Sequence, residues 1–162
     1  VTLEWETGTR SRTHARSMMI GPHRAARTFS WKVDEPRQLL GGNHGANPQE
    51  LLFSAMGSCI LVAFVMGATA RGVQLETLEI EVDGQLDLRG FMGLANGEAT
   101  GFSKLTYQIH VAADAGQDVL EEIHQQAIAH SPNAQTLLHG VTLAGSLKID
   151  QDTQPVAVGE HA

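Results

Sequence analysis

The chain has 162 residues, of which 42% are hydrophobic and 18% charged, a composition typical of one globular domain. A chain of this length buries about two-thirds of its unfolded surface, so it can fold without a disulfide or a metal. The single cysteine excludes an internal disulfide and a cysteine-rich zinc site and fits a reducing compartment, and the net charge of −7 argues against nucleic acid and anionic membranes as partners.

The first forty residues contain most of the basic side chains, seven of the eleven lysines and arginines. No apolar segment of the kind found in a signal peptide follows this basic stretch, so we expect a cytoplasmic protein. Strand-like runs over 13–20 and 27–33 are separated by the turn signal Gly21-Pro22-His23. The glycine-rich segment 40–46 is interpreted as a connector, because it lacks the spacing of a phosphate-binding loop.

The strongest helix signal follows this connector. Asn47 is a favourable N-cap, Pro48 suits the first helical position, and Glu50 completes a capping box. Gly72 is the expected residue just after the helix ends, so the helix is predicted over 48–71. Those 24 residues span about 36 Å.

The interior of this helix, residues 51–70, contains no charged residue. That length matches a membrane span, but its small and hydroxylated residues make it only moderately apolar, and the flanking segments resemble ordinary globular strands. A helix that is apolar all round can also be the buried axis of a soluble protein, which is the interpretation we favour. Dimerisation would provide further surface in which to bury it.

An antiparallel hairpin is predicted after the helix, because 78–88 and 102–111 both alternate and Asn96-Gly97 lies between them. Phe91, Met92 and Leu94 fall outside this periodicity, which indicates either local packing or a surface for a partner.

The last elements are a helix, a short turn and a strand. An amphipathic helix is predicted over 117–130, Asn133 is placed as the cap of a short turn, and 141–149 is predicted as a strand. The order of elements favours an α+β fold over alternating βαβ units. Residues 1–150 are therefore expected to form one domain, and residues 151–162 a flexible tail.

Cys59 is the one classical nucleophile in a suggestive context, in the middle of the long helix with small residues one turn away on each side. The alternative is a buried cysteine that acts as a small hydrophobe. A reactive thiol needs a nearby cation, and the basic N-terminal region is the natural source. Glu50 precedes Cys59 by nine positions and faces the opposite side of the helix, whereas Gln49 is about 80° from it.

Metal and hydrolase sites are poorly supported. The spacing Glu121-x-x-His124 belongs to di-iron sites, but such sites need it twice and it occurs once. The remaining histidine pattern contains no HExxH motif, and no GxSxG motif is present. We therefore expect no metal and no cofactor, with the following histidines as surface or hydrogen-bonded core residues: His110, His124, His130 and His139.

Several segments together resemble one family over residues 27–149. They are Asp34-Glu35-Pro36, Leu40-Gly41-Gly42, Asn47 to Leu52, Ala55 to Cys59, Asp87 to Leu94, Ser131-Pro132 and Thr136-Leu137. This combination resembles the OsmC/Ohr family of osmotically inducible and organic hydroperoxide resistance proteins. The resemblance implies an OsmC-like α+β fold with antiparallel sheets around a long buried central helix, in an intertwined homodimer. It also implies cysteine-dependent reduction of organic hydroperoxides at the subunit interface.

Family members with this activity use two cysteines, a glutamate and an arginine. The attacking cysteine matches Cys59, but the resolving cysteine falls at Ser131 and the glutamate falls at Gln49, which carries no charge. The arginine matches Arg37 best in offset, and Arg27 and Arg16 are alternatives.

The resemblance and these replacements leave three hypotheses. In the first, Cys59 reduces organic hydroperoxides in a one-cysteine cycle that is completed by an external thiol reductant, with weakened or altered reactivity. In the second, the protein is a non-catalytic relative that binds a small apolar or thiol-bearing ligand at the dimer interface. In the third, the scaffold has a structural role or another activity.

Overall fold

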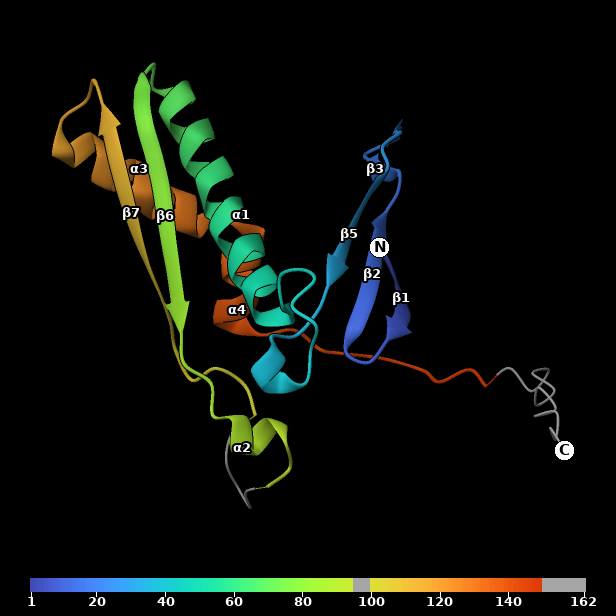
Figure 1. Cartoon of the computed structure of the whole chain (residues 1–162). Coiled ribbons are helices and arrows are strands. Elements are labelled where there is room, and N and C mark those ends of the chain that lie inside the picture. The colour runs from blue at the N-terminus through green and yellow to red at the C-terminus, as the bar shows by residue number, and fades with distance from the viewer. Residues whose placement is uncertain (95–99, 150–162) are drawn as a thin grey trace, which may run out of the picture.

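The computed structural model describes residues 1–94 and 100–149 as an α+β fold in two parts. The chain begins with short antiparallel strands, passes through a glycine-rich loop into a long helix, and ends with a hairpin and further helices (Figure 1). The predicted Asn96-Gly97 turn and the predicted tail, residues 151–162, lie outside the described residues.

The first part is built around an antiparallel sheet of β1 (Thr2–Thr7), β2 (Arg10–Ala15) and β5 (Phe29–Val33), in the order β1-β2-β5. We call it the N-terminal sheet. A separate two-stranded ribbon of β3 (Met18–Ile20) and β4 (His23–Ala25) turns at Gly21, whose φ of 58° favours glycine.

Two sequence predictions need correction in this part. The predicted single strand over 13–20 is two strands, β2 and β3, which belong to different sheets. No separate range was predicted for β1, which pairs with β2 from Arg10 to His14. Local alternation does not reveal such breaks, because a strand ends where its pairing partner ends.

The second part, which we call the body, consists of α1 (Pro48–Ala70), β6 (Leu75–Gly84), β7 (Leu105–Ala113), α3 (Gln117–Ala129) and α4 (Pro132–His139). β6 and β7 form an antiparallel pair in which Ile80 lies opposite Ile109. The apolar side of this hairpin packs on α1 together with α3 and α4. The predicted positions of α1, the hairpin and α3 are confirmed, with shifts of a few residues at their ends.

The connection between β6 and β7 differs from the prediction. The strand was expected to continue through Leu88, but it ends at Gly84 and a short helix, α2 (Leu88–Phe91), follows. Asp87 causes this change, because its carboxylate accepts hydrogen bonds from the backbone N–H and the guanidinium of Arg89. The same arginine lowers the pKa of Asp87 to about 2.

The core of the body is continuous along one side of α1. Its buried members are Met56, Ile60, Phe64, Ala68, Ile123, Ala127 and Ala134. Two glycines allow the elements to approach closely: a Cβ at Gly57 would stand 3.2 Å from Val82, and one at Gly67 would stand 3.2 Å from Ile123. The small residues of the α1 interior therefore serve packing against the hairpin and α3.

The predicted final strand is wrong for this chain. Residues 141–149 follow α4 without strand or helix structure, and they extend away from the body past the N-terminal sheet (Figure 1). Four apolar side chains of this segment are 67–90% exposed: Val141, Leu143, Leu147 and Ile149. The alternation that predicted the strand is present, but no strand of the described chain pairs with it.

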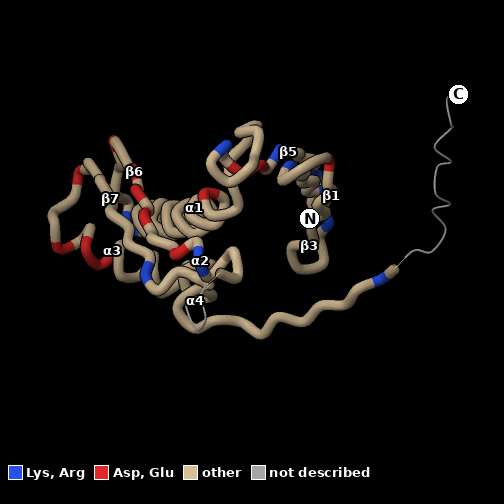
Figure 2. Tube along the Cα trace, turned by 60° about the horizontal axis from the view of Figure 1, so that its bottom comes forward, with Lys and Arg blue, Asp and Glu red and all other residues tan. Residues whose placement is uncertain are grey.

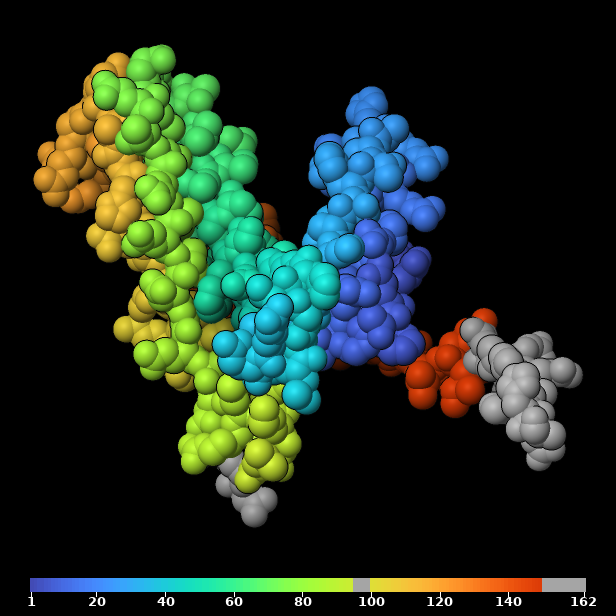
Figure 3. All heavy atoms as spheres, viewed as in Figure 1, coloured from blue at the N-terminus to red at the C-terminus, as the bar shows by residue number. Residues whose placement is uncertain are grey.

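The N-terminal part and the body are joined at one place and differ in charge. The N-terminal strands form a lobe that joins the body at the loop before α1 (Figure 3). Acidic residues follow β6 and α3 in the body, whereas basic residues gather on the N-terminal strands (Figure 2).

Candidate functional site

The site is organised by α1, which holds Cys59 at its centre. The helix begins with the predicted capping box: the Asn47 side chain accepts from the Glu50 N–H at 2.8 Å, and the Glu50 carboxylate accepts from the Asn47 N–H at 2.8 Å. It ends before Gly72, which has a φ of 70°. Both ends are fixed by local interactions, so the position of Cys59 along the helix is well determined.

The two sides of α1 have different surroundings. One side carries the buried core residues, and the other carries uncharged side chains that are exposed, of which Val62 is 60% and Met66 is 67% exposed. We call this second side the exposed strip of α1, and it comprises Ala55, Ser58, Val62, Val65 and Met66. A single chain therefore buries one side of α1, and the expected burial of the rest of the helix in a homodimer stays a prediction.

Cys59 lies at the border between these two sides and is partly exposed. Its sulfur has no hydrogen-bond partner in the part of the chain that the structure describes. The residues one turn away, Ala55 and Ala63, are small. A molecule that covered the exposed strip would also meet the thiol.

The first turn of α4 packs beside the same stretch of α1. The Asn133 side-chain amide donates to the carbonyl of Ala55 at 2.7 Å, one turn before Cys59. Ser131 is completely buried and caps α4, because its hydroxyl accepts from the Ala134 N–H at 3.3 Å. The prediction that Asn133 caps this element is wrong, and the element is a full helix with Pro132 at its first position.

Gln49 is partly buried in the first turn of α1. It precedes Cys59 by ten residues, or about 15 Å along the axis, so the two side chains of one chain cannot touch. Glu50 is engaged in the capping box, as expected.

The candidate arginines lie outside α1. Arg37 begins the 3₁₀ helix η1 (Arg37–Leu39), where its side chain is exposed. Arg27 stacks over the Phe29 ring at 4.8 Å, and Arg16 lines a small pocket with it beside the N-terminus. None of the contacts seen among residues 1–94 and 100–149 joins these arginines to Cys59.

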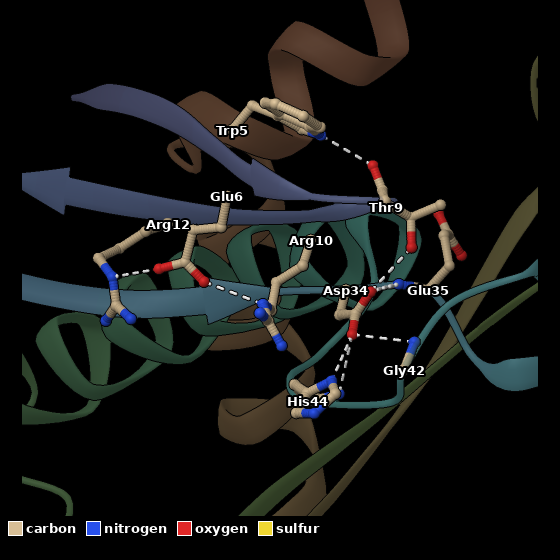
Figure 4. Close-up of polar contacts among 10 residues, drawn as sticks. Trp5, Glu6, Thr9, Arg10, Arg12, Asp34, Glu35, Gly42 and His44 are labelled. Carbon is tan, nitrogen blue, oxygen red and sulfur yellow. Dashed lines mark hydrogen bonds and ion pairs between the residues drawn. The ribbon is translucent and has the colours of Figure 1, made fainter. Parts of the chain in front are cut away.

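A buried carboxylate fixes the loop between the N-terminal sheet and α1 (Figure 4). Asp34 is 2% exposed and accepts hydrogen bonds from the Thr9 hydroxyl at 2.8 Å, from the His44 ring at 2.8 Å, and from the backbone N–H groups of Glu35, Gly42 and His44. The His44 ring and then the other donors hold the pKa of Asp34 well below its usual range.

Neighbouring groups complete this cluster. Gly41 is required, because a Cβ there would collide with the backbone of Glu35. Burial, followed by the charges of Asp34 and Glu50, raises the pKa of Glu35. Sequence reasoning missed this cluster, although an aspartate directly after a strand and before a glycine-rich loop is a signal that could have found it.

The basic residues of β2 are paired within the N-terminal sheet (Figure 4). Glu6 forms ion pairs with Arg10 at 2.9 Å and with Arg12 at 2.7 Å. Arg10 and Arg12 are therefore held in ion pairs with Glu6. The candidates for activating the thiol remain Arg37, Arg27 and Arg16.

The histidines of the body have ordinary roles. The Nε2 atom of His124 lies 2.7 Å from the Tyr107 hydroxyl, and Glu121 accepts from Gln117 at 2.7 Å. Within the described ranges, no group of three or more His, Cys, Asp or Glu side chains could hold a metal ion.

The family model described as OsmC-like protein matches residues 41–144, which include α1, the hairpin, α3 and α4. The chain belongs to the OsmC-like protein family. None of the curated proteins matches this OsmC-like chain significantly.

Three solved structures have similar folds. An OsmC-like protein from Mycoplasma pneumoniae is 16% identical with a TM-score of 0.61, over 80% of this chain and 86% of that one. An OsmC-like hydroperoxide resistance protein from Jannaschia sp. CCS1 is 19% identical with a TM-score of 0.53, over 91% and 90%. An organic hydroperoxide resistance protein OsmC from Legionella pneumophila is 18% identical with a TM-score of 0.50, over 84% and 93%. These similarities establish the OsmC-like fold.

The length and composition of α1 would also suit a membrane span. An 18-residue window within Pro48–Ala70 has a mean hydropathy of 2.2, so the helix is long and apolar enough to cross a bilayer by length and composition. The core contacts of α1 with β6, α3 and α4 explain the same composition. OsmC-like proteins are soluble.

Proposed function

We propose that this OsmC-like protein reduces organic hydroperoxides through Cys59 in a one-cysteine cycle. The observation that carries the proposal is the place of the thiol: the chain's one cysteine lies partly exposed at the centre of α1, beside an uncharged exposed strip. Relatives of similar fold are named hydroperoxide resistance proteins, which favours peroxide chemistry over other reactions of a thiol.

The chemistry begins with the Cys59 thiolate, which attacks the distal oxygen of the hydroperoxide. A sulfur–oxygen bond forms as the oxygen–oxygen bond breaks, and the leaving alkoxide takes up a proton and departs as an alcohol. The sulfur, oxidised by two electrons, remains as a sulfenic acid. Since the chain has one cysteine, it cannot form an intramolecular disulfide.

An external thiol therefore completes the cycle. The first thiol condenses with the sulfenic acid to give a mixed disulfide and water. A second thiol attacks this disulfide, which releases the Cys59 thiol and the oxidised external reductant. Ser131 is buried as the cap of α4, so its replacement of a resolving cysteine leaves α4 intact.

Activation of the thiol requires a cation from outside α1, because residues 51–70 are uncharged. Arg37 is our first candidate, with Arg27 and Arg16 as alternatives in the connections between the N-terminal strands. The N-terminal strands pack among themselves and not on the exposed strip of the same chain. We therefore place the activating arginine on a second copy of the chain.

A homodimer accounts for three exposed surfaces at once. The exposed strip of α1 and residues 141–149 are apolar and lack partners within the described chain. The N-terminal sheet also exposes apolar side chains, among them Trp5 and Phe29. Exposed apolar surface on this scale is typical of an interface. The basic N-terminal strands and the acidic body are complementary in charge, which favours contact between two copies.

The test is a stoichiometric assay with an aromatic or fatty-acid hydroperoxide, added to the reduced protein without any reductant. The proposal predicts loss of about one equivalent per chain and a sulfenic acid on Cys59 that mass spectrometry detects after trapping. Cys59→Ser should consume none, and Ser58→Ala, one position away on the exposed strip, should behave like the wild type. Equal loss in the wild type and Cys59→Ser would refute the proposal.

A second function is favoured by the replaced residues. Gln49 carries no charge and Ser131 is no thiol, so the chain lacks two groups that family members with this activity use. The alternative is a relative without activity that binds a small apolar or thiol-bearing ligand between two copies. It predicts an inert Cys59 and a ligand-dependent rise in Tm. We place either activity in the cytoplasm, where external thiols are reduced.

A further inference from the structure

A cleft of about 660 Å³ opens on the body, on a different side of α1 from the exposed strip. Its apolar walls come from four elements: Leu52, Met56 and Ile60 of α1, Leu105 of β7, Ile128 of α3 and Leu137 of α4. Ile60 is completely buried and Leu137 is 40% exposed, so the cleft has a closed floor and an open rim. The volume lies within the range of small-molecule sites.

The cleft does not belong to the proposed thiol site. Cys59 is absent from its lining. At ~100° per residue, Met56 and Ile60 point more than 100° away from Val62, at the centre of the exposed strip. Leu52 lies between the two sides, about 80° from Val62, so the cleft adjoins the exposed strip at this residue.

The polar groups of the cleft are few. Tyr107 lines it with its ring, while its hydroxyl is paired with His124 at 2.7 Å. Lys104 is the charged residue of the lining, and it is exposed where the chain enters β7. In the part of the chain that the structure describes, its ammonium group forms no ion pair. The cleft therefore combines apolar walls with one available cation at its rim.

We propose that this cleft binds an anionic amphiphile, a carboxylate with an unbranched alkyl chain. The alkyl chain packs against α1 and α4, and the carboxylate lies against Lys104 at the rim. Burial of the alkyl chain supplies most of the affinity, since each apolar group removed from water is favourable. An exposed ammonium contributes less to affinity, and it selects the carboxylate over a neutral or cationic head group.

The test uses the full chain and a fluorescent probe, dansyl-undecanoate, which brightens in an apolar site. Decanoate should displace the probe more strongly than decanol, and decyltrimethylammonium should be the weakest competitor. Cys59→Ser should bind the probe as the wild type does, because the thiol does not line the cleft. A failed peroxide assay would therefore not count against binding in the cleft. A failed binding assay would likewise not count against the peroxide chemistry of Cys59.

Two variants test the two parts of the site, each with a matched control. Lys104→Gln should weaken the binding of decanoate about two- to five-fold and leave the binding of decanol unchanged. Lys32→Gln, at an exposed lysine of β5, should change the binding of neither ligand. Leu137→Asp should weaken both ligands on the order of tenfold. Leu88→Asp makes the same change at a residue of α2 that is also 40% exposed and lies outside the cleft, and it should bind normally.

Three results would overturn the inference. The first is absence of probe binding to the wild type, which is also the outcome if a second copy fills the cleft. The second is normal binding to Leu137→Asp. The third is a preference for decanoate that Lys104→Gln leaves unchanged.

Discussion

The two sides of α1 differ in what covers them. On one side, β6, α3 and α4 bury Phe64 and Ile60 almost completely. On the other side, Val62 and Met66 of the exposed strip are equally apolar and stay uncovered. The homodimer proposed above accounts for this difference, because a second copy would cover the uncovered side. An uncharged interior of twenty residues is what a helix with two apolar partners requires.

The same contrast separates the body from the two ends of the described chain. The body forms its own core, whereas the N-terminal sheet and residues 141–149 expose apolar side chains. Cys59 lies where the covered and uncovered sides of α1 meet. Our account therefore places the thiol site at the boundary between two copies of the chain.

The largest expected effect is on the covered side. Phe64→Ala should lower the free energy of unfolding by about 3–5 kcal/mol, because it removes a buried ring and leaves a cavity in the core. Urea unfolding measures the change. Phe91→Ala, at a phenylalanine of α2 that is 56% exposed, should stay within about 0.5 kcal/mol of the wild type. A similar loss in both variants would show that the body core is not where we place it.

A charge on the uncovered side of α1 should dissociate the proposed dimer. Met66→Asp places a charge in the proposed interface and should weaken self-association by about 3–5 kcal/mol, since the carboxylate would be buried without a partner. Sedimentation at several protein concentrations measures this. Gln125→Glu introduces the same charge at an exposed residue of α3, outside the exposed strip, and should leave self-association unchanged. If Met66→Asp still self-associates as the wild type does, the exposed strip is not part of the interface.

The loop that joins the two parts gives a pH-dependent prediction. Hydrogen bonds lower the pKa of Asp34 in the folded state, so its contribution is fully present above the ordinary aspartate pKa of about 4 and is lost as the pH falls through the folded-state pKa. Asp34→Asn should lower the Tm at pH 7, and its deficit relative to the wild type should shrink in acid.

Thermal scans from neutral to acidic pH measure this difference. Asp118→Asn, at an exposed aspartate of α3, is the matched control and should show no such trend. A deficit that is constant with pH would mean that the Asp34 charge is not stabilised in the folded protein.

The smallest expected effect concerns the contact between α4 and α1. Asn133→Ala removes the hydrogen bond to the Ala55 carbonyl and should cost about 1 kcal/mol of unfolding free energy. Denaturant unfolding measures it, with Gln126→Ala on the outer surface of α3 as the control. An unchanged stability would mean that packing alone holds α4 against α1.

The sequence predicted those elements that local interactions determine. The start of α1 was correct because Asn47, Pro48 and Glu50 satisfy the capping box among themselves. The hairpin was correct because both segments alternate in sequence, and β6 and β7 pair antiparallel along their length. The same logic could have found the cap of α4, since Ser131-Pro132 repeats the pattern of Asn47-Pro48, but Asn133 was chosen instead.

Features that depend on distant partners could not be predicted in the same way. Residues 141–149 alternate like a strand, yet a strand requires a neighbour that the described chain does not provide. The position of Cys59 on α1 followed from the sequence, but its activating cation did not, because helical phase places only groups on the same helix. Gln49 illustrates this limit. Its angle around the helix axis places it on the same side as Cys59, but its distance along the axis is too large for contact.

The mass of the reduced protein in solution tests the central claim most directly, because the thiol site is proposed to form between two copies. Sedimentation equilibrium at micromolar concentration should give about 35 kDa, twice the 17.4 kDa of the chain. A mass of 17.4 kDa would contradict the account, since the exposed strip of α1 would then face water and Cys59 would lack its second copy.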